Sequence, residues 1–364
     1  MYVSTLFLLN FRNHVEADFQ FTKGVNCIVG SNGSGKTNVL DAIHYLSLCR
    51  SYLNPTDRQN IRFNEQFFVI QGLWHKDNSD FELYCGVKNG AKKVFKKNKK
   101  EYERLADHIG LFPVVMISPY DTDLISEGSE YRRKWMDSII SQFDRTFLSD
   151  LQRYNKVIDQ RNALLKHQYE NGFFERESLE IWDEQLVKYG EEIFKKRTEF
   201  IEVFVPLFQN YYQWISENSE QVSLTYESKL QSSDFRKLLV EAYPKDSRSQ
   251  HTSVGIHKDD LIFQIEGMPI KRFGSQGQQK SFLIALRLAQ FDWLKSHLNQ
   301  TPILLLDDIF DKLDNHRVSK LMDLVSNNTF EQVLVTDTDE HRVKSVFENI
   351  DVKPNMISFS EVKV

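Results

Sequence analysis

Alternating and continuous apolar runs make the first third of the chain rich in predicted strands. Turn-forming and charged residues separate these runs from one another. The predicted strands are Tyr2–Leu9, Phe19–Phe21, Val25–Val29, Phe67–Trp74 and Phe81–Val87. The segment Lys36–Leu48, which follows the third strand, is predicted to be a helix. This part of the chain therefore looks like half of an α/β core.

The middle of the chain changes to helical spacing. One apolar face is predicted from Trp135, Ile139, Phe143 and Phe147, and another from Leu179, Trp182, Leu186, Tyr189 and Ile193. Such stripes usually face a protein core, so they indicate neither a cofactor site nor a membrane segment. We expect residues 118–250 to form a mainly helical insertion domain.

The last third returns to strand patterns, beginning with the alternation of Leu261, Phe263 and Ile265. A helix with Phe282 and Leu286 on one face comes next, and Ile303–Leu306 is apolar at every position. A strand of that kind is buried on both faces, as in a parallel sheet. We therefore expect residues 1–117 and 251–364 to be the two halves of one α/β domain.

Composition adds limits to this picture. A chain of 364 residues exceeds the size at which one hydrophobic core stops growing, so two structural units are expected. No run reaches the roughly 18 to 20 apolar residues of a membrane span, and no signal peptide is evident, so a cytoplasmic protein is predicted. Cys27, Cys49 and Cys85 are too far apart in the sequence to indicate a zinc site, and they are expected to be buried.

The charge of the chain argues against a protein that coats nucleic acid. The net charge is −5, so any DNA site must be local. The strongest basic cluster lies within residues 92–100, which hold six lysines. These ammonium groups could neutralise phosphates, but a solvated hairpin tip is the favoured interpretation.

A phosphate-binding loop follows the predicted strand Val25–Val29. The sequence Gly30-Ser31-Asn32-Gly33-Ser34-Gly35-Lys36-Thr37 matches GxxxxGK[ST] and leads directly into a helix. Its glycines allow backbone N–H groups to surround a β-phosphate at the helix N-terminus. Lys36 would bridge the β- and γ-phosphates, and the Thr37 hydroxyl would bind Mg²⁺. The loop predicts binding of ATP or GTP, but it does not distinguish between the many P-loop enzyme classes.

Two acidic residues end the apolar strand Ile303–Leu306. Asp307 is placed to hold the Mg²⁺, and Asp308 to orient the attacking water. Most ABC-type enzymes use Glu at the second position. Because Asp is one methylene shorter, slow hydrolysis is predicted. Asp314 completes an Asp-Asp-x₅-Asp spacing.

The segment that precedes the last predicted helix resembles the LSGGQ signature of ABC-type ATPases. It reads Phe273-Gly274-Ser275-Gln276-Gly277-Gln278-Gln279-Lys280. Ser275, Gly277, Gln278 and the helix N-terminus would bind the γ-phosphate of a nucleotide held by a partner subunit. Gln276 replaces the usual glycine. Because P-loop, signature and paired acids occur in this order, we expect an α/β ABC-type ATPase head that carries the helical insertion.

Two other ABC elements are altered. Thr336-Asp337-Thr338 occupies the place where a switch histidine usually follows a strand, and we do not assign that role to the nearby His341. The glutamine that usually precedes the helical insertion has no clear equivalent. Residues 117–121 lie in that neighbourhood, and Gln71 is a poorer candidate because it belongs to an earlier strand.

Several further segments resemble the RecF family, which is related to SMC-type heads. They are Asn10–His14, Arg50–Tyr52, Ser118–Asp137, Tyr154–Leu165 and Gly255–Leu261. In such heads the first segment lies against the nucleotide, which gives that role here to Arg12 and Asn13. The residues of the last segment, His257 to Asp260, could form a catalytic centre, but a salt-bridged turn is favoured. Arg132, Arg133 and Arg161 could touch DNA, although helix packing is the more usual role.

The resemblance implies an ATP-dependent homodimer that sandwiches two nucleotides and holds DNA. The implied DNA is single-stranded, gapped or a junction, and the implied partners are RecR and RecO type mediators, with no membrane. Three alternatives stay open at this point: the ATPase subunit of an ABC transporter, a structural SMC-type head, and a nucleotide-gated DNA-binding module with almost no turnover.

Overall fold

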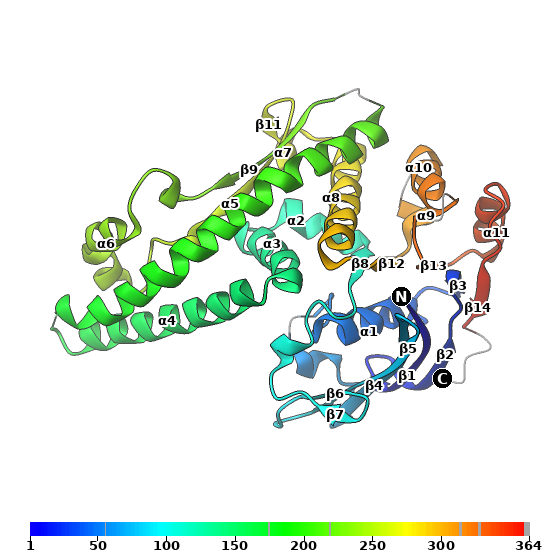
Figure 1. Ribbon diagram of the computed structural model, residues 1–364, viewed down its shortest axis with the longest axis horizontal. Coiled ribbons are helices and arrows are strands. Elements are labelled where there is room, and N and C mark those ends of the chain that lie inside the picture. The colour runs from blue at the N-terminus through cyan, green and yellow to red at the C-terminus, as the bar shows by residue number, and fades with distance from the viewer. Residues whose placement is uncertain (55, 174, 218–219, 313–314, 327–328, 360–364) are drawn as a thin grey trace. The chain divides into compact units, whose positions relative to one another are not determined.

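The protein divides into two compact units. The structure, a computed structural model, describes residues 1–54, 56–173, 175–217, 220–312, 315–326 and 329–359. The first unit combines Met1–Thr122 with Gln276–Val364, and the second is Asp123–Ser275 (Figure 1). The first unit is therefore assembled from both ends of the chain.

A five-stranded parallel sheet forms the centre of the first unit, in the order β14-β3-β13-β12-β8. Its strands are β3 (Gly24–Val29), β8 (Val114–Ile117), β12 (Ile303–Leu306), β13 (Gln332–Asp337) and β14 (Asn355–Ser358). All four residues of β8 and of β12 are buried, as expected for parallel strands covered on both faces. The prediction for Ile303–Leu306 is confirmed residue for residue.

A six-stranded antiparallel sheet of order β2-β1-β4-β5-β6-β7 forms a second layer. Its strands are β1 (Tyr2–Phe11), β2 (His14–Gln20), β4 (Phe67–Lys76), β5 (Ser79–Lys88), β6 (Val94–Lys97) and β7 (Lys100–Glu101). The strand predicted at Phe19–Phe21 begins five residues earlier, at His14. Buried Ala17 and Phe19 alternate there with exposed charged residues, a pattern that the short prediction missed.

Helix α1 (Lys36–Leu48) has the predicted bounds and contacts strands of both sheets. Nearly all of its side chains are buried because it lies between two layers. The other helices of this unit are α8 (Gln276–Leu298), α9 (Ile309–Lys312), α10 (Asn315–Ser326) and α11 (Glu340–Glu348), with short 3₁₀ turns at Asp57–Asn60, Leu105–Asp107 and Pro119–Thr122. The three cysteines are buried and free, as predicted.

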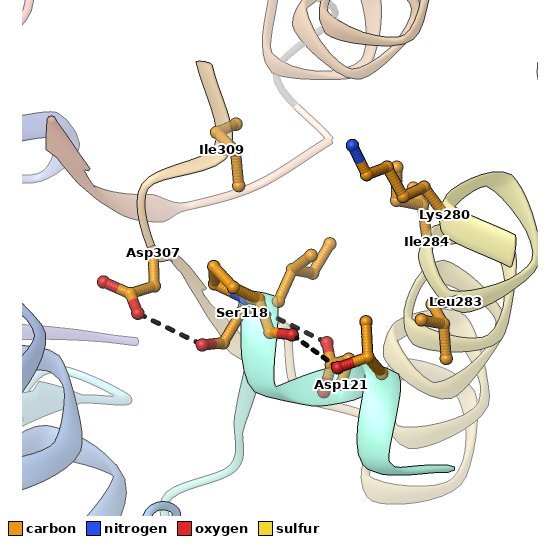
Figure 2. A pocket seen from close by; sticks show the side chains of 10 residues that line it. Ser118, Asp121, Lys280, Leu283, Ile284, Asp307 and Ile309 are labelled. Carbon is orange, nitrogen blue, oxygen red and sulfur yellow. Dashed lines mark hydrogen bonds between the residues drawn. The ribbon is translucent and has the colours of Figure 1, made fainter. Parts of the chain in front are cut away.

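A small cavity lies at the carboxyl edge of the parallel sheet, beside Asp307 (Figure 2). Its volume is about 190 Å³, and Leu283 and Ile284 of α8 form much of its apolar wall. Asp121, in the turn after β8, accepts a hydrogen bond from Arg287 of α8 at 2.6 Å. This buried ion pair fixes α8 against the end of β8.

The second unit is helical with a small sheet of order β11-β10-β9. Its elements are α2 (Asp123–Ser126), α3 (Ser129–Phe143), α4 (Arg145–Glu170), a 3₁₀ turn (Glu177–Leu179), α5 (Glu180–Ser216), β9 (Val222–Glu227), a 3₁₀ turn (Lys229–Gln231), α6 (Phe235–Ser249), a 3₁₀ turn (Ile256–Lys258), β10 (Asp260–Ile265), β11 (Met268–Pro269) and α7 (Ile270–Phe273). The long helices α4 and α5 pack against one another.

Two expectations for this region were wrong. The strand at Leu261–Ile265 does not return to the α/β core, because β10 pairs with β9 and stays in the second unit, which ends at Ser275 instead of residue 250. The apolar stripe from Trp135 to Phe147 belongs to two helices. Asp144 ends α3 and caps α4, where its carboxylate accepts a hydrogen bond from the Phe147 N–H at 2.9 Å.

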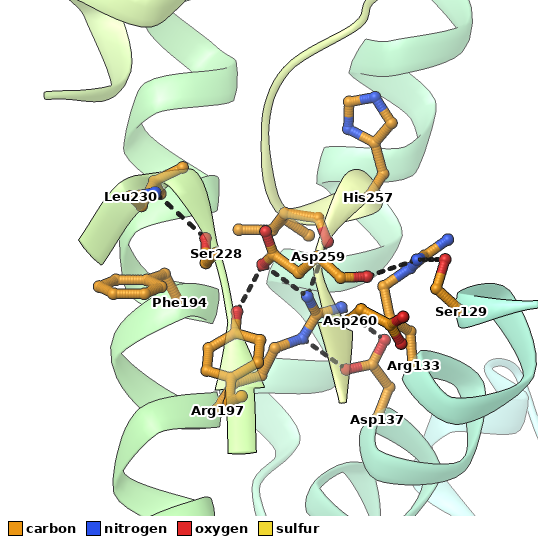
Figure 3. Close-up of polar contacts among 12 residues, drawn as sticks. Ser129, Arg133, Asp137, Phe194, Arg197, Ser228, Leu230, His257, Asp259 and Asp260 are labelled. Atoms are coloured by element: carbon orange, nitrogen blue, oxygen red, sulfur yellow. Dashed lines mark hydrogen bonds and ion pairs between the residues drawn. The ribbon is translucent and has the colours of Figure 1, made fainter. Parts of the chain in front are cut away.

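Buried arginines hold the second unit together (Figure 3). Arg197 of α5 makes two hydrogen bonds of 2.9 Å to Asp137 of α3, and it also donates to the Ile256 carbonyl at 2.8 Å. Asp259 accepts from Arg197 at 3.3 Å and from the Tyr226 hydroxyl at 2.5 Å. The salt-bridged interpretation of residues 257–260 is therefore confirmed.

Residues of the segment Tyr154–Leu165, which lies in α4, also hold the second unit together. Arg161 is fully buried and pairs with Asp183 at 2.7 Å and Asp246 at 2.8 Å. Tyr154 hydrogen-bonds His257 at 2.8 Å. Arg132 pairs with Asp260, and Arg133 donates to the Asp259 carbonyl. These arginines pack the unit, which was the role favoured over DNA contact.

In the described residues, no helix has the length and apolar character that a membrane span requires.

We expect Arg197→Met to destabilise the second unit by about 3 to 5 kcal/mol, because it leaves the Asp137 and Asp259 carboxylates buried without their cation. Hydrogen exchange of the α3 and α5 amides measures the loss. The matched control is Arg236→Met, which removes an exposed arginine and should change stability by less than about 0.5 kcal/mol. Unchanged protection in Arg197→Met would show that the cluster does not anchor these helices.

A second prediction concerns His108, which is buried between Tyr102 and the Leu46 carbonyl. Burial lowers its pKa to about 4, although the hydrogen bond to Leu46 opposes the shift. The unfolded chain takes up this proton near pH 6.5 and the folded chain only near 4, so stability falls as the pH drops through that window. His108 should account for a loss of about 2 kcal/mol between about pH 7.5 and about pH 5.

Urea unfolding at both pH values, for the wild type and for His108→Gln, measures this contribution. Glutamine keeps a donor for the Leu46 carbonyl but has no proton to gain. Its stability should therefore depend less on pH, whereas the control His251→Gln, at an exposed position, should behave like the wild type. Equal pH dependence of His108→Gln and the wild type would contradict the assignment.

Candidate nucleotide site

The phosphate loop joins β3 to α1 in the conformation that the motif requires. Gly33 and Gly35 have φ of +78° and +105°, in the left-handed region that favours glycine. At Gly35 a β-carbon would also meet the side chains of Asn13 and His14 at 2.6 to 2.7 Å. Only glycine fits there without displacing the neighbouring turn.

Lys36 is held in the centre of the loop. Its ammonium donates hydrogen bonds of 2.8 Å to the carbonyls of Gly30 and Ser31. Burial lowers the pKa of Lys36, while the nearby carboxylates of Asp308, Asp337 and Asp307 oppose that shift. The charge is therefore positioned where phosphate oxygens could replace the two carbonyls.

Asn13 and Arg12 lie next to this loop, at the turn between β1 and β2. The Asn13 amide donates to the Ser34 carbonyl at 3.0 Å and accepts from Asn38 at 2.7 Å, so it supports the loop from outside. Arg12 forms an ion pair of 2.9 Å with buried Asp41 of α1. The structure thus attaches both residues to the loop and its helix, while their predicted contact with a nucleotide stays a prediction.

Asp307 is fixed by three hydroxyl groups from three elements. Its Oδ1 accepts hydrogen bonds from Thr37 of α1 at 2.8 Å and from Thr336 of β13 at 2.9 Å. Its Oδ2 accepts from Ser118, after β8, at 3.1 Å (Figure 2). Thr37 and Asp307 were predicted to share a metal, and the structure brings them together. The hydroxyl of Thr37 and the carboxylate of Asp307 are the hard oxygen donors that Mg²⁺ prefers.

Ser118 and Thr336 were not recognised from the sequence. Each follows or ends a buried apolar strand, and parallel strands present their carboxyl ends at the same sheet edge. A hydroxyl residue at the end of β8 and another in β13 were therefore the available signal. Thr336 lies in the segment where a switch histidine was sought.

Asp308 has a left-handed backbone with φ of +49°. Its N–H donates to the Thr336 hydroxyl at 3.0 Å, which is the same hydroxyl that donates to Asp307. One threonine thus positions both acids. A non-glycine residue in this region carries backbone strain, which is found where surrounding structure and function require it.

The signature segment begins helix α8. Ser275 directly precedes the helix, and Gly277 and Gln278 are in its first turn. A β-carbon on Gly277 would lie 3.1 Å from a guanidinium nitrogen of Arg317, whose Nε donates to Ser281 at 2.7 Å. The small residue at 277 therefore makes room for this arginine.

The altered ABC elements have defined places. Gln71 lies in β4 of the antiparallel sheet and donates a hydrogen bond to Glu82 of β5 at 2.6 Å. Asp337 is fully buried and forms an ion pair with Arg342 at 2.7 Å. The side chain of His341 is exposed. Asp314 lies outside the described residues.

Comparison with known proteins agrees with this architecture. Residues 2–358 match the family described as RecF/RecN/SMC N terminal domain. The "DNA replication and repair protein RecF" of Flavobacterium johnsoniae is 51% identical, over 95% of this chain and 96% of that protein. The protein of the same name from Phocaeicola vulgatus is 48% identical, over 96% and 94%.

Solved structures extend the comparison to the fold. A structure of "the recombination mediator protein RecF-ATP in RecFOR pathway" has a TM-score of 0.89 and 30% identity, covering 100% of this chain and 97% of that chain. An SMC head bound to a domain of ScpA has a TM-score of 0.54 at 16% identity, covering 93% and 90%, and shows a shared fold alone. With these similarities over nearly its whole length, the chain belongs to the RecF family and has the ABC-type ATPase head of that family.

Proposed function

We propose that the protein binds DNA under the control of ATP, in DNA replication and recombinational repair, and hydrolyses ATP slowly. The observation that carries the proposal is the Thr37–Asp307 contact of 2.8 Å beside a complete phosphate loop, in a chain that belongs to the RecF family. Its relatives are named DNA replication and repair proteins, and one solved relative is described with ATP. Family membership also argues against an ABC transporter subunit.

The phosphate loop accounts for nucleotide binding. Backbone N–H groups between Gly30 and Thr37, at the start of α1, would surround the β-phosphate. The Lys36 ammonium would exchange its two carbonyl partners for β- and γ-phosphate oxygens. The backbone of Ser31, Asn32 and Ser34 forms part of the loop that would surround the phosphates.

Thr37 and Asp307 are the residues that would hold Mg²⁺, which neutralises charge on the phosphate oxygens. Ser118 and Thr336 keep the Asp307 carboxylate in one orientation through both of its oxygens. Asp307 therefore needs little reorganisation when the metal and nucleotide bind.

Asp308 would orient the water for hydrolysis. The water oxygen forms a bond to the γ-phosphorus while the bond from that phosphorus to the β–γ bridging oxygen breaks, and ADP leaves with the electron pair. The proton of the water passes to the Asp308 carboxylate or to the released phosphate. Because Asp308 is shorter than the usual glutamate, we expect a slow chemical step.

The signature supplies the second half of the proposal. Ser275, Gly277 and Gln278 would bind the γ-phosphate held by a second copy, so that ATP joins two copies and DNA is held across them. Loss of the γ-phosphate then releases the dimer. We expect gapped, single-stranded or junction DNA as the ligand, RecR and RecO type mediators as partners, and the cytoplasm as the location.

The first test measures binding to gapped duplex with ATP, with ADP and without nucleotide, together with mass in solution. We expect ATP-specific binding by a dimer. Lys36→Met should lose both properties because it removes the phosphate charge, and Ser275→Arg because it blocks the surface offered to the second copy. The matched control Ser232→Arg, at an exposed serine, should behave as the wild type.

Binding that is independent of nucleotide would contradict this function, as would a monomer with ATP at high concentration. DNA binding that survives Ser275→Arg in full would retain the DNA role but reject the composite site. The three results are therefore distinguishable.

A second test concerns Thr336. Thr336→Val keeps the shape of the side chain but removes both the hydrogen bond to Asp307 and the acceptor for the Asp308 N–H. We expect single-turnover hydrolysis to fall by about ten-fold or more, as for other lost preorganising groups, with ATP affinity within about three-fold.

Thr336→Ser is the matched control, because it retains the hydroxyl and should recover most of the rate. Equal rates in Thr336→Val and the wild type would show that this hydroxyl does not position the two acids. A loss of ATP affinity equal to the loss of rate would mean that the substitution disturbs the whole site.

A further inference from the structure

Two segments at one end of strands β4 and β5 carry a local excess of positive charge in this acidic protein. Residues 56–67 and 86–100 contain nine lysines and arginines against only Asp57 and Glu65, although the whole chain has a net charge of −5. The two segments adjoin, since Phe67 pairs with Lys88 across β4 and β5, and the Asn89 N–H donates to the Gln66 carbonyl at 2.9 Å. Together they are called the basic surface here.

A cavity of mixed polar and apolar lining opens within the basic surface. Its volume is about 320 Å³, and Arg58, Lys88 and Lys93 line it. The Lys93 ammonium is engaged in contacts within the protein, because it forms an ion pair with Asp57 at 2.8 Å and donates a hydrogen bond to the Cys49 carbonyl at 2.7 Å. Arg58 and Lys88 are exposed, so their charges are available to a ligand at the rim of this cavity.

The lysines of residues 92–100 fall into two groups, those that contact aromatic rings of the sheet and those that are exposed. The Lys96 ammonium lies over the Tyr84 ring, and the Lys97 ammonium lies over the Phe81 ring. Both side chains are therefore engaged in contacts within the sheet. Lys92 is exposed in the turn beside the cavity, and Lys99 and Lys100 are exposed at the β6–β7 turn. The exposed charge of this run thus lies on turns within the basic surface.

An exposed aromatic side chain lies in the first segment of the basic surface, next to Arg62 in the sequence. Phe63 is 86% exposed, more than any other large apolar side chain in the described residues. Its turn is held in place, because the Arg62 N–H donates to the Asn10 carbonyl at 2.9 Å and the Glu65 N–H to the Arg62 carbonyl at 3.0 Å. The ring is therefore presented by a preformed turn, so little conformational entropy is lost when a ligand covers it.

These features fit single-stranded nucleic acid. A strand needs cations along its phosphates and aromatic faces for its unpaired bases. A protein partner fits less well, because the centres of protein interfaces are depleted in lysine and other charged residues, whereas the chain neighbours of Phe63 are Arg62, Asn64 and Glu65. We propose that the basic surface binds single-stranded DNA, with phosphates at Arg58 and Lys88 and a base stacked on Phe63.

This inference rests on the proposed DNA-binding function and adds the location and the strand preference of the contact. Stacking requires an unpaired base, whereas a phosphate contact does not. Substitutions of Phe63 and of the cations should therefore have different consequences for single-stranded and for duplex DNA.

The experiment measures fluorescence anisotropy of labelled oligo(dT), and of a blunt duplex of equal length, with the full chain, ATP and Mg²⁺ over a range of salt. Phe63→Ala should weaken oligo(dT) binding by about five- to 150-fold and leave duplex binding unchanged, while Phe63→Trp should retain both. Arg58→Gln with Lys88→Gln should weaken both ligands and reduce the salt slope for oligo(dT) by about 1.4.

Matched controls are Ile181→Ala, which removes a side chain that is 60% exposed on α5, and Lys195→Gln, which removes an exposed charge from the same helix. Both should bind as the wild type does. ATP affinity measured on every variant checks that the first unit is folded.

The possible results separate the two proposals. Wild-type binding that is unchanged in the Phe63 and Arg58/Lys88 variants overturns the basic surface and leaves the proposed function intact. Equal loss of oligo(dT) and duplex binding in Phe63→Ala overturns base stacking. No binding of either DNA by the wild type with ATP overturns the proposed function and this inference with it.

Discussion

The nucleotide site depends on one carboxylate, that of Asp307, which is held by hydroxyl groups from α1, β13 and the segment after β8. Each hydroxyl comes from a part of the chain that is far away in sequence. Their convergence requires the parallel order β3-β13-β12-β8, because only then do the strand ends meet at one edge. The sheet order thus fixes the geometry of the site.

Helix α1 connects this geometry to the rest of the first unit. It carries Lys36 and Thr37 at its N-terminus and Asp41, the partner of Arg12, one turn later. Its remaining side chains pack between the two sheets. A displacement of α1 would therefore disturb the phosphate loop, the contact with Asp307 and the core of the unit at once, since dense packing transmits such strain.

In the second unit, buried ion pairs hold the helices together. Arg161 and Arg197 are buried and each neutralises two carboxylates, which fixes how α3, α4, α5 and α6 meet. Buried pairs of this kind add little net stability over an apolar core, but the loss of one partner leaves the other without compensation. Polar residues that look like a catalytic centre in sequence are therefore structural here.

The sequence by itself determined several strands of the first unit, among them Ile303–Leu306, together with the helix Lys36–Leu48 and the phosphate loop. These features are local, because glycine geometry, helix start and strand burial follow from neighbouring residues. Only the tertiary structure decided that β10 belongs with β9, that Ser118 and Thr336 reach Asp307, and that Arg12 is bound to Asp41. Those contacts join residues that are distant in the chain, and a pattern with a period of two or 3.6 residues carries no information about which distant residues will meet.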